Sequence, residues 1–513
     1  MLFNSYEFLF LFLPATLAVF FVLSGTRHQR MAAAWLALAS IFFYGYWNPR
    51  YVFLLLASIA VNFGIGQAIM GYRVAKKFRH AKLALVVAVS ANLVALGYFK
   101  YANFFVDSLN AVGVAHLTLP KIILPIGISF FTFTQIAFLV DTYSGKVREP
   151  GIVPYTLFVT FFPHLIAGPV LHHAEMMPQF ARDSTYRFNL DNFKLGAIYF
   201  FIGLFKKVVL ADGVQPFVGP VFESDPAHSL TVLEAWGGVL AYTLQLYFDF
   251  SGYSDMAIGL SKLVNVDLPL NFDSPYKAAN ISDFWRRWHM TLSRFLRDYL
   301  YVPLGGNRYG QTRRYTNLMT TMLLGGLWHG AGWTFVIWGG LHGLYLVVHQ
   351  LWQAGLARLR GPVSRPPSAT GRAFSVLCTF LCVVVAWVFF RATSLETALR
   401  ILEGMAGFGG FSLPVEWRLA LEDAPLLANL RPTFAPLEAF GGVRQLGWIT
   451  ALLIVVWTLP NSQQIIASLQ NRAAVLRQER WAWMSLGGLA VVVFLLVAIN
   501  GSRGSSEFIY FNF

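Results

Sequence analysis

Long stretches without any charged residue constrain this chain more than any other feature of its sequence. No Asp, Glu, Lys or Arg occurs in the windows 8–26, 31–49, 51–72, 83–99, 122–140, 315–357, 373–390, 445–471 and 481–502. A helix needs about 20 apolar residues to cross roughly 30 Å of hydrocarbon, and lipid leaves a spanning segment no other open-chain structure. The windows therefore predict an all-α polytopic membrane protein.

The composition agrees, because only 12% of the residues are charged whereas soluble domains have about 25%. Shorter apolar pieces occur at 151–174, 195–205 and 235–248. The window 315–357 is long enough for two spans, or for one span and a re-entrant segment. We expect about ten to twelve transmembrane helices with one or two re-entrant segments.

The net charge of +14 points to topology and not to a nucleic-acid partner. Basic residues fall in short loops, which is the positive-inside pattern of cytoplasmic loops. They are Arg27, Arg30, Arg73, Lys76, Lys77, Arg79, Lys82, Lys146 and Arg148. We expect a multi-pass protein of the bacterial inner membrane, with residues 8–24 retained as an anchor and the N-terminus in the periplasm.

We find no internal repeat, so we interpret residues 1–513 as a single membrane domain with three regions. Residues 1–120 form N-terminal spans, and residues 351–513 form C-terminal spans with an irregular insert at about 404–444. Between them, in 121–350, charged, aromatic and glycine residues interrupt the apolar runs. Ionisable residues at membrane depth mark functional sites by default, so we expect the catalytic core in this middle region.

The stretch 323–333 is the strongest candidate for chemistry. His329 lies inside the 43-residue charge-free window, surrounded by Gly325, Gly326, Gly330, Ala331 and Gly332. Small residues make room for a substrate or for a close helix neighbour. Trp328 and Trp333 are candidates for pocket walls. The alternative is a packing histidine that bonds across two helices.

A second candidate, 284–300, combines four arginines with His289. We expect Arg287, Arg294 and Arg297 roughly on one helical face, with Arg286 close by. Guanidinium groups bind phosphate bidentately, so the cluster could bind a phosphorylated donor such as coenzyme A. The alternative is an interfacial anchor helix, which also suits Trp285 and Trp288.

Two further segments carry polar residues among apolar ones. Asp249 and Asp255, in 247–256, follow an apolar run and need partners, for which we favour the arginines above. Pro163 and Pro169 should break a helix near His164.

We expect Cys378 and Cys382 to pack inside the bundle. The spacing of His329, His342 and His349 predicts no metal site, and zinc-protease, phosphate-loop and serine-hydrolase motifs are absent.

Taken together, these motifs resemble the membrane-bound O-acyltransferase superfamily. The blocks 162–169, 247–260, 284–289, 296–301, 304–308 and 323–330 look like those of the alginate O-acetyltransferase membrane subunit. The insert at 404–444 and the C-terminus match less well. The ending Phe508–Phe513 resembles tails of related polysaccharide acetylases.

The resemblance implies a helical ring around a central funnel, with His329 as catalytic histidine and His289 as the second active-site histidine. It also implies acetyl-CoA as cytoplasmic donor, no bound cofactor, and a periplasmic partner with a serine-esterase fold. Polysaccharide synthesis and export proteins would complete the assembly. The expected function is O-acetylation of an exopolysaccharide such as alginate. The rivals are O-acetylation of peptidoglycan, D-alanylation, lipid acylation and, outside the enzyme class, a transporter or flippase.

Overall fold

The computed structural model describes residues 1–25, 29–114, 116–147, 151–360, 368–421, 433–476, 488 and 508–509. They form two compact units, each assembled from separated parts of the chain. Unit 1 comprises Met1–Phe205, Gly252–Asn271 and Ser462–Asn512, and unit 2 comprises Lys206–Ser251, Phe272–Asn461 and Phe513. The chain is 76% helical, which confirms the predicted all-α fold. The window 481–502 lies almost wholly outside the described residues.

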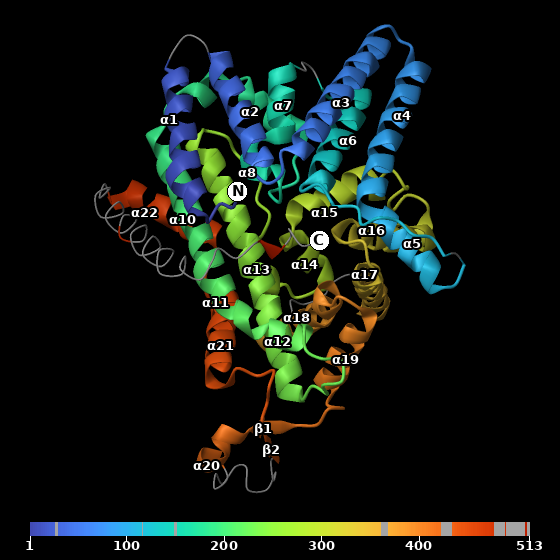
Figure 1. Cartoon of the computed structure of the whole chain (residues 1–513), viewed down its shortest axis with the longest axis vertical. Coiled ribbons are helices and arrows are strands. Elements are labelled where there is room, and N and C mark those ends of the chain that lie inside the picture. Colours follow the sequence, from blue (N-terminus) through green and yellow to red (C-terminus); the bar gives the residue numbers. More distant parts are fainter. Residues whose placement is uncertain are drawn as a thin grey trace. The chain divides into compact units, whose positions relative to one another are not determined.

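Unit 1 consists of helices and their connections (Figure 1). They are α1 (Leu13–Ser24), α2 (Gln29–Gly45), α3 (Arg50–Val74), α4 (Phe78–Leu96), α5 (Ala102–Ala111), α6 (Ile128–Ser144), α7 (Ile152–Thr160), α8 (Phe162–Leu165), α9 (His173–Phe180), α10 (Leu190–Phe205) and α22 (Ser462–Leu476). The break between α7 and α8 at Phe161 confirms the interruption expected before Pro163.

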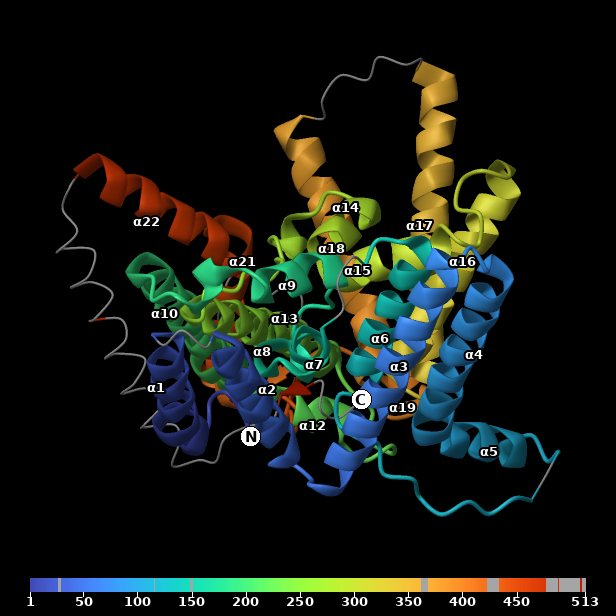
Figure 2. The same ribbon diagram turned by 90° about the horizontal axis from the view of Figure 1, so that it is seen from above.

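Polar side chains connect three long helices of unit 1. α3, α4 and α6 lie against one another (Figures 1 and 2). Asn62 of α3 and Asn92 of α4 exchange amide hydrogen bonds of 2.6 and 3.3 Å. Gln135 of α6 donates to the Ser58 hydroxyl of α3 at 2.9 Å. Such bonds join helices where lipid removes the hydrophobic drive for association.

The basic loops of unit 1 gather at one end of its helices. The Arg73 guanidinium donates to the carbonyl of Tyr143, which joins the last turn of α3 to the end of α6. Arg30 and Lys146 both line one groove, which has a volume of about 910 Å³. These contacts put Arg30, Arg73 and Lys146, which represent three separate groups of the basic residues predicted to be cytoplasmic, on one side of this unit. Arg27 and Arg148 lie outside the described residues.

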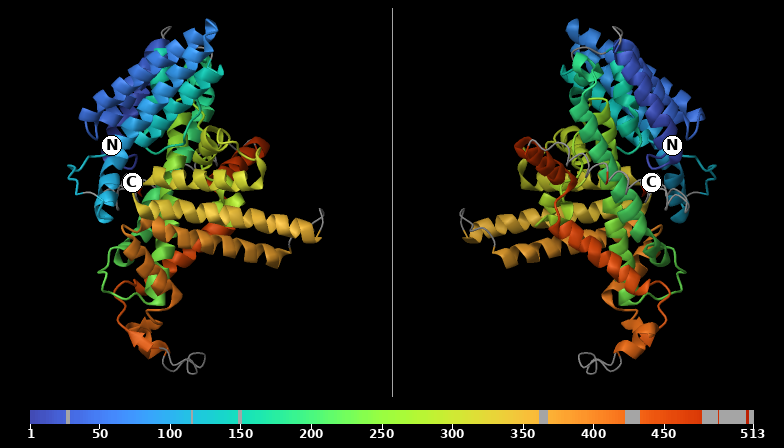
Figure 3. Two further views of the ribbon diagram at one scale, coloured as in Figure 1. Left: turned by 90° about the vertical axis from the view of Figure 1, so that its right-hand side faces the viewer. Right: turned by 90° about the vertical axis from the view of Figure 1, so that its left-hand side faces the viewer.

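Unit 2 contains the longest helices and a small sheet. Its elements are α11 (Asp212–Val214), α12 (Gly219–Phe222), α13 (Val232–Leu263, of which 252–263 belong to unit 1), α14 (Ile281–Arg287), α15 (Met290–Leu296), α16 (Gly310–His329), α17 (Trp333–Arg360), α18 (Ala369–Arg391), α19 (Leu395–Ala406), β1 (Ser412–Pro414), α20 (Arg418–Leu421), β2 (Thr433–Ala435) and α21 (Gly442–Thr458). α16, α17 and α18 run side by side (Figure 3). The window 315–357 thus holds two helices, as its length allowed.

Irregular turns interrupt the helices where polar residues occur. Segments of π-helix extend α4, α10 and α15 at 97–101, 206–211 and 297–301, and such turns are frequent at functional sites. Within the described part of the insert at 404–444, β1 and β2 pair in parallel beside the short α20 (Figure 1).

Within the described residues, four helices are long and apolar enough to cross a membrane: Glu7–Ser24, Arg50–Val74, Phe78–Ala111 and Ala369–Arg391. A fifth would follow if α21 and the start of α22 formed one bent span. The chain is thus a multi-pass membrane protein, and the count of ten to twelve spans stays a prediction. Cys378 and Cys382 are exposed on α18, so the prediction that they pack inside the bundle is wrong.

Candidate active site

A break between two short helices buries His289. α14 ends at Arg287, α15 begins at Met290, and the His289 backbone between them is left-handed with φ of 43°. This conformation costs a residue other than glycine about 1–3 kcal/mol and clusters at functional sites. The side chain of His289 is 0% exposed, and its ring meets the Phe250 ring edge-on at 4.8 Å.

His329 is the last residue of α16, where the helix stops at an extended Gly330. Its side chain is 4% exposed. Aromatic rings surround it, with centroids 5.1 Å away for Trp338 of α17, 5.2 Å for Phe390 of α18 and 4.9 Å for Trp328. Two neighbouring helices therefore fix the orientation of this imidazole.

The glycines around His329 serve close helix packing. A Cβ atom on Gly326 would lie 2.3 Å from the Phe335 carbonyl oxygen, and one on Gly339 of α17 would lie 2.3 Å from the Met322 carbonyl oxygen. α16 and α17 therefore approach with their backbones nearly in contact. The sequence predicts that these small residues make room either for a substrate or for a neighbouring helix. Gly326 makes room for a neighbouring helix, α17. Trp333 is 59% exposed.

The two predicted histidines meet in unit 2. The ring centroids of His289 and His329 are 6.3 Å apart, and Trp328 lies 6.3 Å from His289. Trp285 is half-buried, and its ring centroid lies 5.9 Å from that of Trp338. Two imidazoles at this separation can flank one reacting group, with one as base and the other as its support.

The four arginines of the predicted cluster are divided among α14, α15 and the π-helical segment 297–301. The break at His289 interrupts the helix, so the expectation that Arg287, Arg294 and Arg297 share one helical face is wrong. Arg287 donates to the Asp283 carboxylate at 3.0 Å, and the exposed Arg297 pairs with Asp298 at 2.7 Å. Arg286 is exposed, and Arg294 is half-buried.

The two acidic residues have partners other than the arginines that we favoured. Lys207, in the π-helical segment after α10, places its ammonium 2.7 Å from Asp249 and 3.0 Å from Asp212. Asp255, in unit 1, accepts a hydrogen bond of 2.5 Å from the Ser462 hydroxyl. Lys207 is buried and was missed, although the default suspicion of ionisable groups beside apolar runs applies to it.

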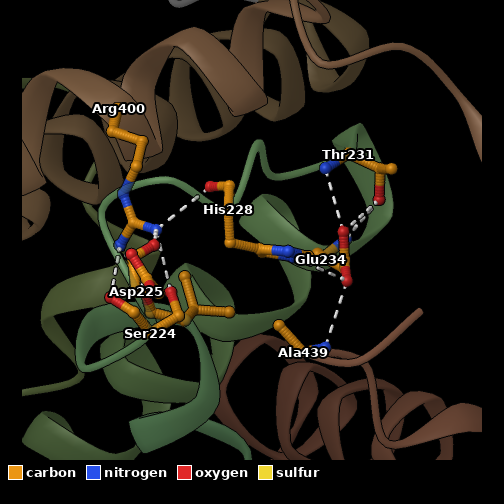
Figure 4. A network of polar contacts seen from close by, with 8 residues as sticks. Ser224, Asp225, His228, Thr231, Glu234, Arg400 and Ala439 are labelled. Atoms are coloured by element: carbon orange, nitrogen blue, oxygen red, sulfur yellow. Dashed lines mark hydrogen bonds and ion pairs between the residues drawn. The ribbon is translucent and has the colours of Figure 1, made fainter.

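A second polar network of unit 2 supports the fold and not the site (Figure 4). The Arg400 guanidinium of α19 donates to the carbonyls of Asp225 and His228 and to the Ser224 hydroxyl, at 2.8–3.2 Å. Buried Glu234 accepts from the N–H groups of Thr231 and Ala439, both at 3.0 Å. These bonds fasten the loop 223–231 to α13 and α19.

Burial would raise the pKa of the Glu234 carboxyl, but the donors of Thr231 and Ala439 outweigh it and lower the pKa below its usual value. Hydrogen bonds to the charged form of a carboxyl act in this direction. Glu234 is therefore ionised in the folded protein near neutral pH.

A third histidine, His342 of α17, lies in the same aromatic cluster, although from the sequence we considered it only as a metal ligand. Its side chain is 0% exposed, and its ring centroid is 4.9 Å from that of Trp338. Its place in the charge-free window, four residues after Trp338, was the available signal. No group of three or more His, Cys, Asp or Glu in the described part of the chain could hold a metal ion.

An all-helical membrane protein with two histidines buried between glycine-packed helices fits the membrane-bound acyltransferases, and sequence comparison agrees. The model of the membrane-bound O-acyltransferase family (MBOAT) matches residues 77–390, which include both histidines. The chain belongs to this family and is an acyltransferase.

The chain is similar to relatives that are named for different polymers. The peptidoglycan O-acetyltransferase of Helicobacter pylori is 39% identical over 100% of this chain and 98% of its own length. The probable alginate O-acetylase AlgI of Azotobacter vinelandii is 43% identical over 80% of this chain and 79% of its own. The teichoic acid D-alanyltransferase of Streptococcus thermophilus is 26% identical over 52% of this chain and 68% of its own.

Proposed function

We propose that this protein passes acetyl groups from a cytoplasmic donor, acetyl-CoA, towards a polysaccharide on the periplasmic side of the membrane, with His329 as the catalytic base. The meeting of His329 and His289 at 6.3 Å, inside the segment that matches the family model, carries this proposal. A transporter would need no such pair, and the relatives are named as transferases.

The proposed reaction is acyl transfer from a thioester to a hydroxyl. Neutral His329 takes the proton of the acceptor hydroxyl, because a hydroxyl is a weak nucleophile until a base assists it. The oxygen then bonds to the thioester carbonyl carbon, the carbon–sulfur bond breaks, and the leaving thiolate takes the proton from the imidazolium. His289 assists from the other side of the reacting group. Base catalysis of this kind contributes about 10²–10⁴-fold.

We infer a location in the bacterial inner membrane with the N-terminus in the periplasm. The grouping of Arg30, Arg73 and Lys146 at one end of unit 1 supports this topology, since basic loops stay in the cytoplasm. A periplasmic partner with a serine-esterase fold would complete transfer to the sugar, together with polysaccharide synthesis and export proteins. Reporter fusions at the N-terminus and at the connection 75–77 between α3 and α4 test the orientation.

The polymer is an exopolysaccharide such as alginate in this proposal, and peptidoglycan is the second candidate. The alginate relative covers 80% of the chain, whereas the peptidoglycan relative covers all of it, including the insert at 404–444. This coverage favours the second candidate enough to test both polymers in one experiment.

The test is the ester-bound acetate of secreted polysaccharide and of purified peptidoglycan from a deletion strain. The strain is complemented with wild type, His329→Ala or His80→Ala, which replaces an exposed histidine at the start of α4 and serves as matched control. We expect His80→Ala to restore acetate and His329→Ala to restore none at equal membrane abundance. Acetate in the His329→Ala strain at the wild-type amount would refute the proposal.

A further inference from the structure

His342 has polar atoms that the surrounding protein does not satisfy. Neither ring nitrogen has a hydrogen-bond partner among the described residues, although the side chain is fully buried. The same holds for the indole nitrogens of Trp285 and Trp338 within that part of the chain. Buried polar atoms nearly always have partners, so a group of exceptions in one place requires a functional explanation.

These three side chains lie together and next to the proposed base. The His342 ring is 5.2 Å from Trp285 and 4.9 Å from Trp338, and Trp338 is 5.1 Å from His329. Phe284 stacks on His342 at 6.0 Å with an interplanar angle of 11°. The unsatisfied atoms thus lie within one cluster of aromatic rings, in which Trp338 is next to both His342 and His329.

The donors and acceptors that lack hydrogen bonds indicate which chemical groups a ligand must have. Each indole offers one N–H donor, and a neutral imidazole offers one donor and one acceptor. Donors outnumber acceptors by three to one, and none of these rings brings a formal charge. Such a set suits a neutral chain rich in carbonyl oxygens with an occasional N–H group, which describes a thioester and the amides of its arm.

We propose that His342, Trp285 and Trp338 bind the carbonyl oxygens of the acyl donor's thioester arm and so position the thioester beside His329. This inference rests on the function proposed above. No residue of this set belongs to the arginine cluster predicted for the donor phosphates.

The face of α17 continues the same path. Trp338, His342, Tyr345 and His349 follow at spacings of four, three and four residues, which places them on one side of the helix over about 16 Å. Tyr345 lies 5.8 Å from His342. His349 is half-buried within electrostatic range of the exposed Arg286. A donor laid along this face would have its thioester at His329 and its phosphates at Arg286.

The test measures acetyl transfer in membrane vesicles that contain the full-length protein, with acetyl-CoA varied. We expect His342→Ala to raise the KM for acetyl-CoA about three- to tenfold, as loss of a hydrogen bond does, with kcat within about twofold. His342→Gln keeps an amide donor and acceptor and should recover most of the affinity. Trp285→Phe, which removes only the N–H, should raise KM, whereas Trp352→Phe at an exposed site on α17 should not.

Equilibrium binding of acetyl-CoA to the purified protein in nanodiscs gives a second measurement that needs no turnover. Weaker binding by His342→Ala with intact binding by His329→Ala supports the inference. A fall in kcat at unchanged KM and unchanged binding would overturn it and make His342 a structural residue. Activity retained by His329→Ala would refute the proposed base and leave the binding comparison of His342 intact. If the wild type neither binds acetyl-CoA nor uses it, the donor is wrong and this inference falls with it.

Discussion

Replacing Gly326 with alanine tests whether the contact between α16 and α17 holds His329 in place. The new Cβ would lie 2.3 Å from the Phe335 carbonyl oxygen and 3.1 Å from Gly339 Cα, where ordinary contact begins at 3.4 Å. The obstacle is backbone, so no side-chain rotation relieves it, and the helices must separate by about 1 Å. Overpacking of this kind costs about 1–3 kcal/mol of stability.

The larger effect should be on catalysis. His329 follows Gly326 by three residues at the end of α16, whereas Trp338, against which it packs, belongs to α17. A separation of about 1 Å therefore moves the imidazole relative to its surroundings, and misplacement by that distance can cost about 10²-fold in rate. We expect Gly326→Ala to reduce polymer acetylation about 10²-fold.

The matched control is Gly355→Ala on α17, where a Cβ would meet nothing within 4 Å. There alanine should stabilise the helix by up to about 1 kcal/mol, because glycine is a poor helix former. Thermal unfolding in nanodiscs gives the stability of each variant, and the acetate content of polymer gives the activity. If Gly326→Ala matches Gly355→Ala in both measurements, the glycine contact does not position His329 and the reasoning is refuted.

Three other perturbations have outcomes fixed by the structure. His329→Ala should abolish acetylation and His289→Ala should reduce it, as measured by polymer acetate at equal membrane abundance, and wild-type acetate in either strain would contradict the corresponding role. Lys207→Met leaves the Asp249 carboxylate buried without its cation and should cost about 3–5 kcal/mol in thermal unfolding. Asp249→Asn in the same chain should recover part of that loss, whereas additive losses would count against the pair. Because the pKa of Glu234 is lowered on folding, its contribution is complete above the ordinary value and is lost as pH falls through the folded-state pKa. The gap in Tm between wild type and Glu234→Gln should thus be largest near pH 7 and shrink below pH 4.5, and a constant gap would exclude this linkage.

The charge-free windows located most of the long described helices because spanning segments must be apolar and helical. The window 315–357 became α16 and α17, and the prolines near 163–169 ended a helix where expected. Whether a segment is helical, and roughly where the helix lies, depends on local composition, which can be read directly from the sequence. The bends that give the site its shape depend on packing and were harder to predict.

In the stretch 284–300, the local sequence predicts one helix, whereas the structure has a break. Its pattern suits one continuous helix, but Trp288 is extended and His289 is left-handed. Trp288 packs against Phe272 at 5.0 Å and Trp387 at 4.9 Å. Phe272 precedes the segment and Trp387 is about a hundred residues after it, and packing of this kind can outweigh the preference of the local sequence for a helix. Two of the four arginines consequently bind nearby carboxylates.

The partner of a buried charge also depends on packing between segments that are distant in the sequence. Asp249 needed a cation, and four arginines about forty residues later were more conspicuous candidates than the adjacent Lys206 and Lys207 about forty residues earlier. Lys207 reaches it because a π-helical segment at 206–211 interrupts the regular helix after α10. An ionisable residue beside an apolar run marks a place where chemistry or structure needs charge, whereas the identity of its partner depends on which helices pack together. A sequence therefore predicts the need for a partner more reliably than it predicts the partner. His342 is fully buried, and neither of its ring nitrogens has a hydrogen-bond partner among the described residues. We therefore infer that a ligand supplies the hydrogen bond.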